Sequence, residues 1–313
     1  MRNWLIVAAI LIVIGLIGAG VTLGQDGFSL KTVDVLKEES VPAAGIKKVR
    51  LETGSTDVTV VRGDGDQIKA ELKGKASGKF IDRIKLEVET TGDVLTIKSR
   101  QDTGFSIGIN ILDVELKVEL PEQQYEELAL DAGSGNAKIS GWSGEKLNID
   151  ISSGNVTAEQ IKGTAELATG SGNITVHELE GEEVVLKTSS GNIRLDQAKI
   201  NKGTVTTGSG EVQLNDVDGP MTVGTSSGGI DIGMERLLHP LNLKTGSGDV
   251  SIETDEEPQS AAIEFDTGSG DLSSDWDNGF SKTGRKGGEL KFGNGEIKVS
   301  VDTGSGSLSV GKR

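Results

Sequence analysis

The sequence of 313 residues contains no cysteine, few prolines and only 3% aromatic residues. Without cysteine no disulfide can form and no lipid can be attached through a thiol, so backbone hydrogen bonds must supply the stability. The net charge of −16 argues against nucleic acid, which needs a basic patch, and against direct adhesion to anionic lipid headgroups. So few aromatic residues are unusual for a sandwich core, but they suit a thin core of valine, isoleucine and leucine.

Glycine, by contrast, is abundant, and much of it belongs to one recurring phrase. Thr-Gly-Ser-Gly or Thr-Ser-Ser-Gly is followed by a small polar residue and then by alternating apolar residues. The second glycine of this phrase is Gly135, Gly154, Gly172, Gly191, Gly210, Gly228, Gly248, Gly270 and Gly306, with a degenerate copy at Gly288. Neighbouring copies lie 18 to 22 residues apart. A period of about 20 residues indicates a stacked-repeat architecture.

One repeat, from Gly172 to Gly191, shows how each unit is built. Apolar residues alternate at Ile174 and Val176, and again at Val184 and Leu186. This period of two predicts two short strands with one buried face each. Two strands cannot bury that face alone, so the repeats must stack. We therefore predict an all-β protein, a parallel β-helix or β-solenoid of about ten rungs over residues 131–313.

The polar residue after the corner glycine is often asparagine, as at Asn136, Asn155, Asn173 and Asn192. Asparagine and serine form local backbone hydrogen bonds in turns, so we expect a hydrogen-bonded ladder of these side chains along the stack. Calcium binding is the alternative, because glycine-aspartate repeats bind that ion in some β-helices. The paired-glycine nonapeptide of those proteins is absent here, which favours the structural ladder.

Residues 1–24 contain an uncharged, almost wholly apolar run that is long enough for a membrane-spanning helix. Arg2 precedes the run and favours an inside N-terminus. We therefore expect a single-pass anchor with the rest of the chain outside the cytoplasm. A cleaved signal peptide is the alternative, although the apolar run is long for one and no clear Ala-x-Ala site follows.

Between this run and the repeats, the pattern changes twice. Residues 25–45 are expected to be a loosely ordered juxtamembrane spacer. Residues 46–130 alternate like strands but lack the repeat register. We therefore expect a β-rich cap region that covers the unpaired edge of the end rung. Within it, Thr53–Val58 resembles an eroded copy of the repeat corner.

Near the other end, an insertion near residues 271–287 interrupts the repeats. The segment is rich in glycine, aspartate and serine and carries Trp276 and Phe280. We expect it to be a loop that leaves the rod. Because it holds two of the few aromatic side chains, it is also the contact surface that the sequence favours.

No set of residues in the sequence assembles a catalytic site. Gly224–Gly228 matches the nucleophile-elbow pattern, but it repeats the corner of every rung and no helix follows it. His177 and His239 fall on different repeats. Paired carboxylates of a polysaccharide-cleaving β-helix would need clustered acids, and outward residues such as Asp231 and Glu253 show no clustering in sequence. We therefore predict no catalytic, cofactor-binding or metal-binding residue and expect no enzyme.

Three segments together resemble a known family: Leu116–Pro121, then Leu128–Asn136, then the tandem Thr-Gly-Ser-Gly repeats. They are similar to the bacterial putative-adhesin family, a domain of unknown function with a β-helical fold. The anchor followed by the domain resembles LiaG-like membrane-anchored proteins of Gram-positive bacteria. The resemblance implies a cell-envelope protein, sometimes linked to the envelope stress response, and defines no catalytic residues.

From these observations we expect a non-enzymatic, membrane-anchored extracytoplasmic β-solenoid that binds or scaffolds an unidentified envelope protein or wall polymer. The alternative of a different class is a carbohydrate-active β-helix enzyme that acts on cell-surface polysaccharide. A purely mechanical spacer is a third hypothesis.

Overall fold

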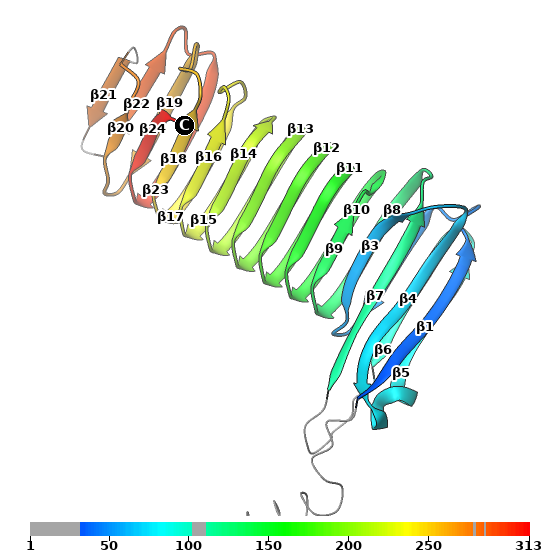
Figure 1. Ribbon diagram of the computed structural model, residues 1–313. Helices are drawn as coiled ribbons and strands as arrows, with labels where there is room; N and C mark the ends of the chain where they lie inside the picture. Colours follow the sequence, from blue (N-terminus) through cyan, green and yellow to red (C-terminus); the bar gives the residue numbers. More distant parts are fainter. Residues whose placement is uncertain (1–31, 102–110, 278–279, 285) are drawn as a thin grey trace, which may run out of the picture.

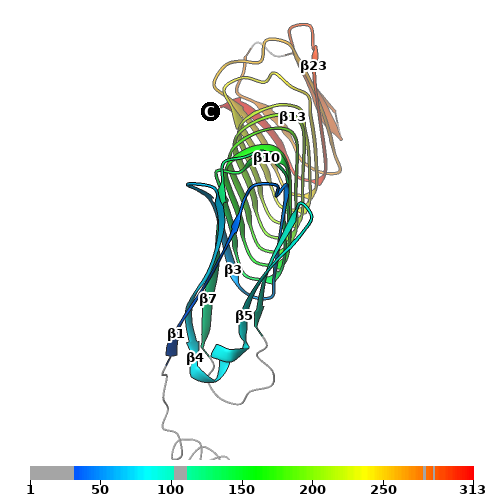
Figure 2. The same ribbon diagram turned by 90° about the vertical axis from the view of Figure 1, so that its right-hand side faces the viewer.

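The computed structural model describes residues 32–101, 111–277, 280–284 and 286–313, with the side chains of 280–284 left aside. The regular secondary structure of these residues is β-strand, apart from the short 3₁₀ helix η1 (Gly78–Arg83). The strands stack into one long solenoid-like rod (Figure 1), and rungs follow one another as nested hoops when the rod is viewed from its end (Figure 2). The all-β prediction is confirmed.

Each rung consists of two strand segments, which we call legs, joined by a glycine corner. The strands of the rod's N-terminal part are β2 (Lys48–Thr53), β3 (Asp57–Gly63), β6 (Val94–Gln101), β7 (Leu112–Pro121), β8 (Tyr125–Ser134) and β9 (Ala137–Ser140). The central strands are β10 (Ser143–Ser153), β11 (Val156–Ser171), β12 (Ile174–Ser190), β13 (Ile193–Ser209), β14 (Val212–Asp218), β15 (Met221–Ser227) and β16 (Ile230–Met234). The remaining rod strands are β17 (Leu241–Ser247), β18 (Val250–Thr254), β19 (Ala261–Thr267), β20 (Leu272–Ser274), β23 (Ile297–Ser305) and β24 (Leu308–Lys312).

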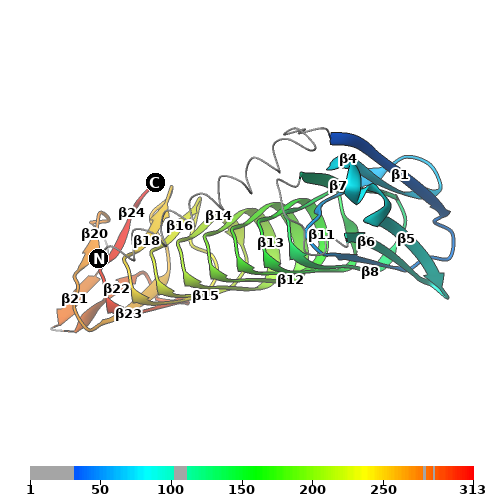
Figure 3. The ribbon, with the colours of Figure 1, turned by 90° about the horizontal axis from the view of Figure 1, so that it is seen from below.

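Neighbouring rungs pair in parallel with an in-register core. Leu167, Leu186 and Val205, for example, lie opposite one another on β11, β12 and β13, and all three side chains are fully buried. The corners of successive rungs therefore lie in a column, as the view from below shows (Figure 3). The predicted alternation of buried and exposed residues holds in these strands, because each leg turns one face to the thin core.

The parallel stacking begins earlier in the chain than the repeat register does. The β2/β3 rung, whose corner follows Thr53, packs between the β6/β7 rung and the β8/β9 rung. The eroded corner seen in the sequence is thus a rung of the rod. Only the antiparallel strands β1 (Thr32–Pro42), β4 (Gln67–Ser77) and β5 (Ile84–Thr91) form the cover on this end. Part of the expected loose spacer is consequently a regular strand, held by antiparallel pairing with β4.

The C-terminal end has the same out-of-order arrangement. The β23/β24 rung packs between the β17/β18 rung and the β19/β20 rung, although it comes last in the chain. The segment expected to be a loop instead contains β20, β21 (Phe280–Gly284) and the start of β22 (Gly287–Phe292). β22 pairs antiparallel with β19 and with β21, so Gly288 is on a covering strand and is not a corner. A hairpin forms here because β19 would otherwise end the sheet with unpaired backbone groups.

No helix among the described residues is long and apolar enough to cross a membrane. The expected anchor, residues 1–24, lies outside the described residues.

Candidate functional site

The glycine corners form one continuous column. Gly154 stacks on Gly135, and the remaining seven follow, with Gly306 between Gly248 and Gly270 in space. An added Cβ at Gly154 would lie 1.9 Å from the carbonyl oxygen of Gly135, which is far inside van der Waals contact. The corner therefore needs glycine because the next rung touches its backbone. These nine residues are structural in role.

Two hydrogen-bonded ladders hold this column. The Oδ1 atom of Asn136 accepts from the backbone N–H of Asn155 at 3.0 Å, and the pattern continues through Asn173 and Asn192. The asparagine ladder predicted from the sequence is confirmed. A second ladder, which the sequence analysis missed, uses the threonine of each repeat: Thr207 Oγ1, for example, donates to the carbonyl of Gly191 at 2.9 Å. These asparagine and threonine side chains are thus hydrogen-bonded within the column, whereas the hydroxyl of Thr53 at the corner of the β2/β3 rung is buried without a partner.

The opposite bend of each rung has a different character. Four non-glycine residues there have left-handed backbone angles, with φ between 53° and 57°: Gln160, Glu178, Gln197 and Asp216. They lie on successive rungs, and the residues on either side of each one pair with the neighbouring strands. Residues held in this conformation cost about 1–3 kcal/mol each, and they concentrate at functional sites. We call this column the left-handed bend.

A groove of about 1090 Å³ runs along the left-handed bend. It spans six rungs, from β3 through the β9–β10 turn to β14. Its lining includes the four left-handed residues, and on neighbouring positions Arg62, Glu122, Trp142, Lys162, Glu180, Lys199 and Asp218. An elongated groove with polar walls and an apolar floor suits an extended ligand that lies along the rod.

The charges of the groove alternate along the rod. Lys162 lies opposite Glu180, Glu180 opposite Lys199, and Lys199 opposite Asp218. Opposite charges on paired strands stabilise the pairing, so part of this pattern is structural. The Lys162 Nζ to Glu180 Oε2 distance is 3.8 Å, and both side chains are about two-thirds exposed or more. Pairs of this kind are weak, so the groups are free to interact with a ligand.

At its N-terminal end the groove meets a small, partly open pocket, which we call the aromatic chamber. The chamber has a volume of about 30 Å³ and is lined by Tyr125 and Trp142, whose rings stack at 5.6 Å between centroids. Trp142 takes the register position held by Ile161 on the next rung. Its ring fits because Gly144 has no side chain: an added Cβ there would lie 2.5 Å from the indole.

The polar atoms of the two aromatic residues are buried without a hydrogen bond. Trp142 is 4% exposed and Tyr125 3%, and neither the indole N–H nor the phenol oxygen has a partner in hydrogen-bonding geometry. Burial raises the pKa of Tyr125 to about 12, and the nearby Gln123 amide offsets part of that shift. The phenol is therefore protonated at neutral pH, and both polar atoms are enclosed by the side chains packed around them.

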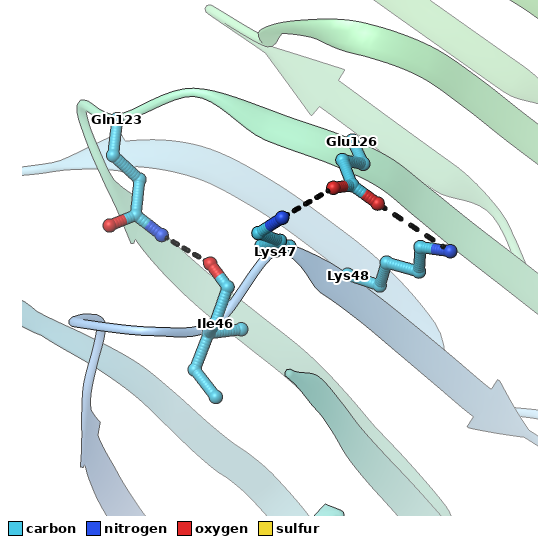
Figure 4. Close-up of polar contacts among 5 residues, drawn as sticks. All are labelled: Ile46, Lys47, Lys48, Gln123 and Glu126. Atoms are coloured by element: carbon cyan, nitrogen blue, oxygen red, sulfur yellow. Dashed lines mark hydrogen bonds and ion pairs between the residues drawn. The ribbon is translucent and has the colours of Figure 1, made fainter. Parts of the chain in front are cut away.

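The segment beside the chamber is fixed by polar contacts to the β1–β2 connection and to the start of β2 (Figure 4). Gln123 Nε2 donates to the carbonyl of Ile46 at 2.8 Å. Glu126 pairs with Lys47 at 2.9 Å and with Lys48 at 3.6 Å. The hydrogen bond from Lys47 lowers the pKa of Glu126. Because these contacts hold the β7–β8 turn, the chamber is preorganised.

At the mouth of the chamber, Arg62 and Glu122 form an ion pair. Both residues line the chamber as well as the groove, and both side chains are more than half exposed. An exposed pair of this kind is worth little to stability, so it can open at small cost. It is therefore suited to exchange one partner for a ligand group.

The residues that sequence reasoning considered for other chemistry lie elsewhere. His177 contacts Glu178 at the groove's edge, whereas His239 contacts Asp218 at 2.6 Å. Burial raises the pKa of Asp231, and the nearby Glu211 and Glu253 add to the shift. These acids project outside the lining of the groove.

Of the two sequence-favoured contact residues, Trp276 and Phe280, the structure describes the side chain of Trp276. Trp276 is half-buried against the core, and its indole N–H donates to the carbonyl of Gly311 at 3.2 Å. The side chain of Phe280 lies outside the described residues. Trp276 therefore helps to seal the C-terminal end, and its availability for a partner stays a prediction.

Comparison with known proteins places the whole repeat region in one family. The family model described as Toastrack DUF4097 matches residues 46–311. A search of curated protein sequences found no significant match. Among solved structures, a "putative lipid binding protein" from Parabacteroides distasonis is similar, with 17% identity, 87% of this chain and 96% of that chain covered, and a TM-score of 0.48. A "putative adhesin" from Bacteroides fragilis is 12% identical, covers 88% and 97%, and has a TM-score of 0.45.

Proposed function

This chain belongs to the Toastrack DUF4097 family, and on that premise we propose that it is a non-enzymatic binding module of the cell envelope, which holds an extended envelope polymer in the groove of the left-handed bend. The observation that carries the proposal is the column of strained residues, Gln160, Glu178, Gln197 and Asp216, which lines the groove over successive rungs. At the other bend the positive backbone angles belong to glycines, whereas this bend places four non-glycine residues in that conformation.

The remaining parts of the proposal concern location. Residues 1–24 would act as a single-pass anchor in the cell membrane, with the rod outside the cytoplasm, as in an envelope protein of a Gram-positive bacterium. The resemblance to LiaG-like membrane-anchored proteins adds a link to the envelope stress response to this proposal. Protease digestion of intact cells tests the orientation: the rod should be cleaved only from outside.

The binding itself is tested by co-sedimentation of the full chain with purified insoluble envelope polymer. Replacing Lys162 and Lys199 by alanine removes two exposed charges from the groove. We expect binding at least five-fold weaker. The matched control removes Lys187 and Lys244, two exposed lysines on the other leg, and should leave binding unchanged. Equal binding by both double variants, or release of soluble products from the polymer, would contradict the proposal.

A further inference from the structure

Four strands in the part of the chain that the structure describes are paired on one side only: β1, β5, β20 and β21. Such edges present free backbone N–H and C=O groups, and proteins usually protect them by short length, charges or bulges. β20 and β21 have only three and five residues, and β5 exposes the charged residues Lys85, Glu87 and Glu89. β1 differs, because it runs for 11 residues in an unbroken register with β4 at the outer border of the cover (Figure 1). It is therefore the longest free edge of the described rod.

The outer face of β1 carries an exposed leucine between two exposed carboxylates. Side chains alternate along a strand and Val35 is buried, so Asp34, Leu36 and Glu38 share the opposite face. Leu36 is 60% exposed, and with Val33 it makes two of the three exposed large apolar residues in the described part of the chain. Asp34 and Glu38 form no ion pair with any described residue. A long edge strand with an exposed leucine is a surface on which another strand can pair.

The neighbouring strands show which charges an added strand would need. On the outer face, Lys75 of β4 lies opposite Asp34 of β1 on one side and opposite Asp113 of β7 on the other. Glu38 breaks this alternation because it lies opposite Glu71, and like charges in opposite positions destabilise the pairing. Both glutamates line a depression of about 570 Å³, which has room for another side chain. A basic residue on the free side of β1 would offset the repulsion there.

These residues favour a basic occupant. A strand added along β1 would place alternate residues opposite Asp34, Leu36 and Glu38, so the complementary pattern is basic, apolar, basic. The pattern reads the same in both directions, so it suits a parallel or an antiparallel partner. A second copy of β1 fits poorly: with Leu36 opposite its own counterpart, Asp34 would lie opposite Glu38 and repel it. The net charge of −16 likewise attracts a basic partner and repels another copy of the chain.

We propose that β1 is a docking edge, which binds an extended basic segment of another protein as an added strand. Backbone hydrogen bonds along the edge supply affinity. Two basic side chains opposite Asp34 and Glu38, with an apolar side chain opposite Leu36 between them, supply specificity. Pro42 ends the edge because proline has no backbone N–H. The docking edge lies on the cover, separate from the groove of the left-handed bend, and therefore adds a second binding surface to the proposed function.

Fluorescence anisotropy of a capped, labelled synthetic peptide with the full chain tests the docking edge. The lysine peptide alternates lysine, leucine and lysine with threonine and valine, and the glutamate peptide has glutamate in place of both lysines. We expect the lysine peptide to bind about ten-fold or more tightly than the glutamate peptide. N-methylation of every second backbone nitrogen blocks the donors along one edge of the lysine peptide. One of the two possible sets should abolish binding and the other should not, because only one edge of the peptide faces β1.

The most informative variant reverses both charges of the docking edge, Asp34→Lys together with Glu38→Lys. It should lose the lysine peptide and bind the glutamate peptide instead, a gain that a misfolded protein cannot produce. Glu87→Lys together with Glu89→Lys is the matched control, since it makes the same change of charge on the β5 edge, and it should keep the preference for lysine. Leu36→Ser should weaken binding of the lysine peptide about three-fold, because an apolar contact is lost.

Three results would overturn the docking edge: equal affinity for the two peptides, binding that survives both sets of N-methyl groups, or an unchanged preference after the reversal on β1. The groove variant with Lys162→Ala and Lys199→Ala should bind the lysine peptide as the unaltered chain does, because those residues lie outside β1. If the lysine peptide binds and envelope polymer does not sediment with the chain, the docking edge stands and the proposed function fails. If the lysine peptide does not bind, the docking edge fails whatever the polymer does.

Discussion

The two bends of each rung use the backbone in opposite ways. At the glycine corner, residues are nearly identical from rung to rung, and their polar atoms pair with the rung before. At the left-handed bend, the residues vary between Gly141, glutamine, glutamate and aspartate, four non-glycine residues have strained backbone angles, and a groove runs along the column. The same legs connect both bends, so the difference does not come from the fold. The repeated residues of the glycine corner therefore stabilise the rod, whereas the variable residues of the left-handed bend lie on the face that can bind a ligand.

The largest expected effect lies in the legs on which both bends depend. Leu186 is fully buried, whereas its neighbour Lys187 is exposed. Leu186→Asp should lower the free energy of unfolding by about 3–5 kcal/mol, because it removes apolar contacts and buries a charge. Lys187→Asp should change it by less than about 0.5 kcal/mol. Urea unfolding followed by circular dichroism measures both, and equal midpoints would contradict the register.

At the corner, Gly154→Ala should cost about 3 kcal/mol, because the new methyl group would collide with the carbonyl of Gly135 in the rung before. Gly224→Ala is the matched control: no atom lies within 4 Å of its added Cβ. Thermal unfolding of both variants should show a large loss for the first and almost none for the second. A small loss at Gly154 would mean that the corners are not in contact.

The threonine ladder is expected to contribute less. Thr207 is buried, and its hydroxyl donates to the carbonyl of Gly191. Thr207→Val keeps the shape but leaves that carbonyl with one bond fewer, which should cost about 1–2 kcal/mol. The exposed neighbour Thr206 gives the control, since Thr206→Val should be close to neutral. Chemical unfolding measures the stability of both variants. Equal losses in the free energy of unfolding would show that the threonine hydroxyl does not stabilise the corner.

At the left-handed bend the effect should be smallest and of opposite sign. Gln160→Gly relieves the strain of φ 56° and should raise the free energy of unfolding by about 0.5–1 kcal/mol. Lys162→Gly, two residues on and without a left-handed angle, should lower it by about 0.5–1 kcal/mol. Denaturant unfolding gives both values. A loss at Gln160→Gly would show that its side chain holds the rod together, and the contrast between the bends would disappear.

The sequence was sufficient for the parts of the fold that repeat. Alternating residues such as Val184 and Leu186 predicted the strands, and the spaced glycines predicted the stack. Every repeat must bury one strand face and place its corner against the next, so the same residue types recur. Asn155 and its counterparts predicted the ladder for the same reason. The threonine ladder was missed because threonine is equally at home in any strand.

The order of the rungs could not be read from the repeats. Parallel in-register pairing looks the same for either neighbour, so nothing in residues 297–312 states that they pack inside the rung made by 261–274. The covering strands were also hidden. β22 carries Gly288, which resembles a corner, but its antiparallel partner β19 is decided by which edge is left unpaired.

The candidate site was almost invisible in sequence. Arg62 in β3, Glu122 between β7 and β8, and Trp142 between β9 and β10 meet only in the fold. One signal was available: Trp142 interrupts a register position that is aliphatic at Ile161 and Leu179. The aromatic residues that did attract attention, Trp276 and Phe280, were chosen for rarity alone, which gives no information about partners.

The inserted C-terminal rung has a consequence for biosynthesis. A ribosome releases β19 and β20 before β23 and β24. The parallel partner of β19 is β23, and that of β20 is β24. An unfinished chain would therefore hold two unmatched sheet edges until its closing segment slides between them. Loss of residues 297–312 would remove an internal layer and, with it, the strands through which β19 and β20 pair with the rest of the rod.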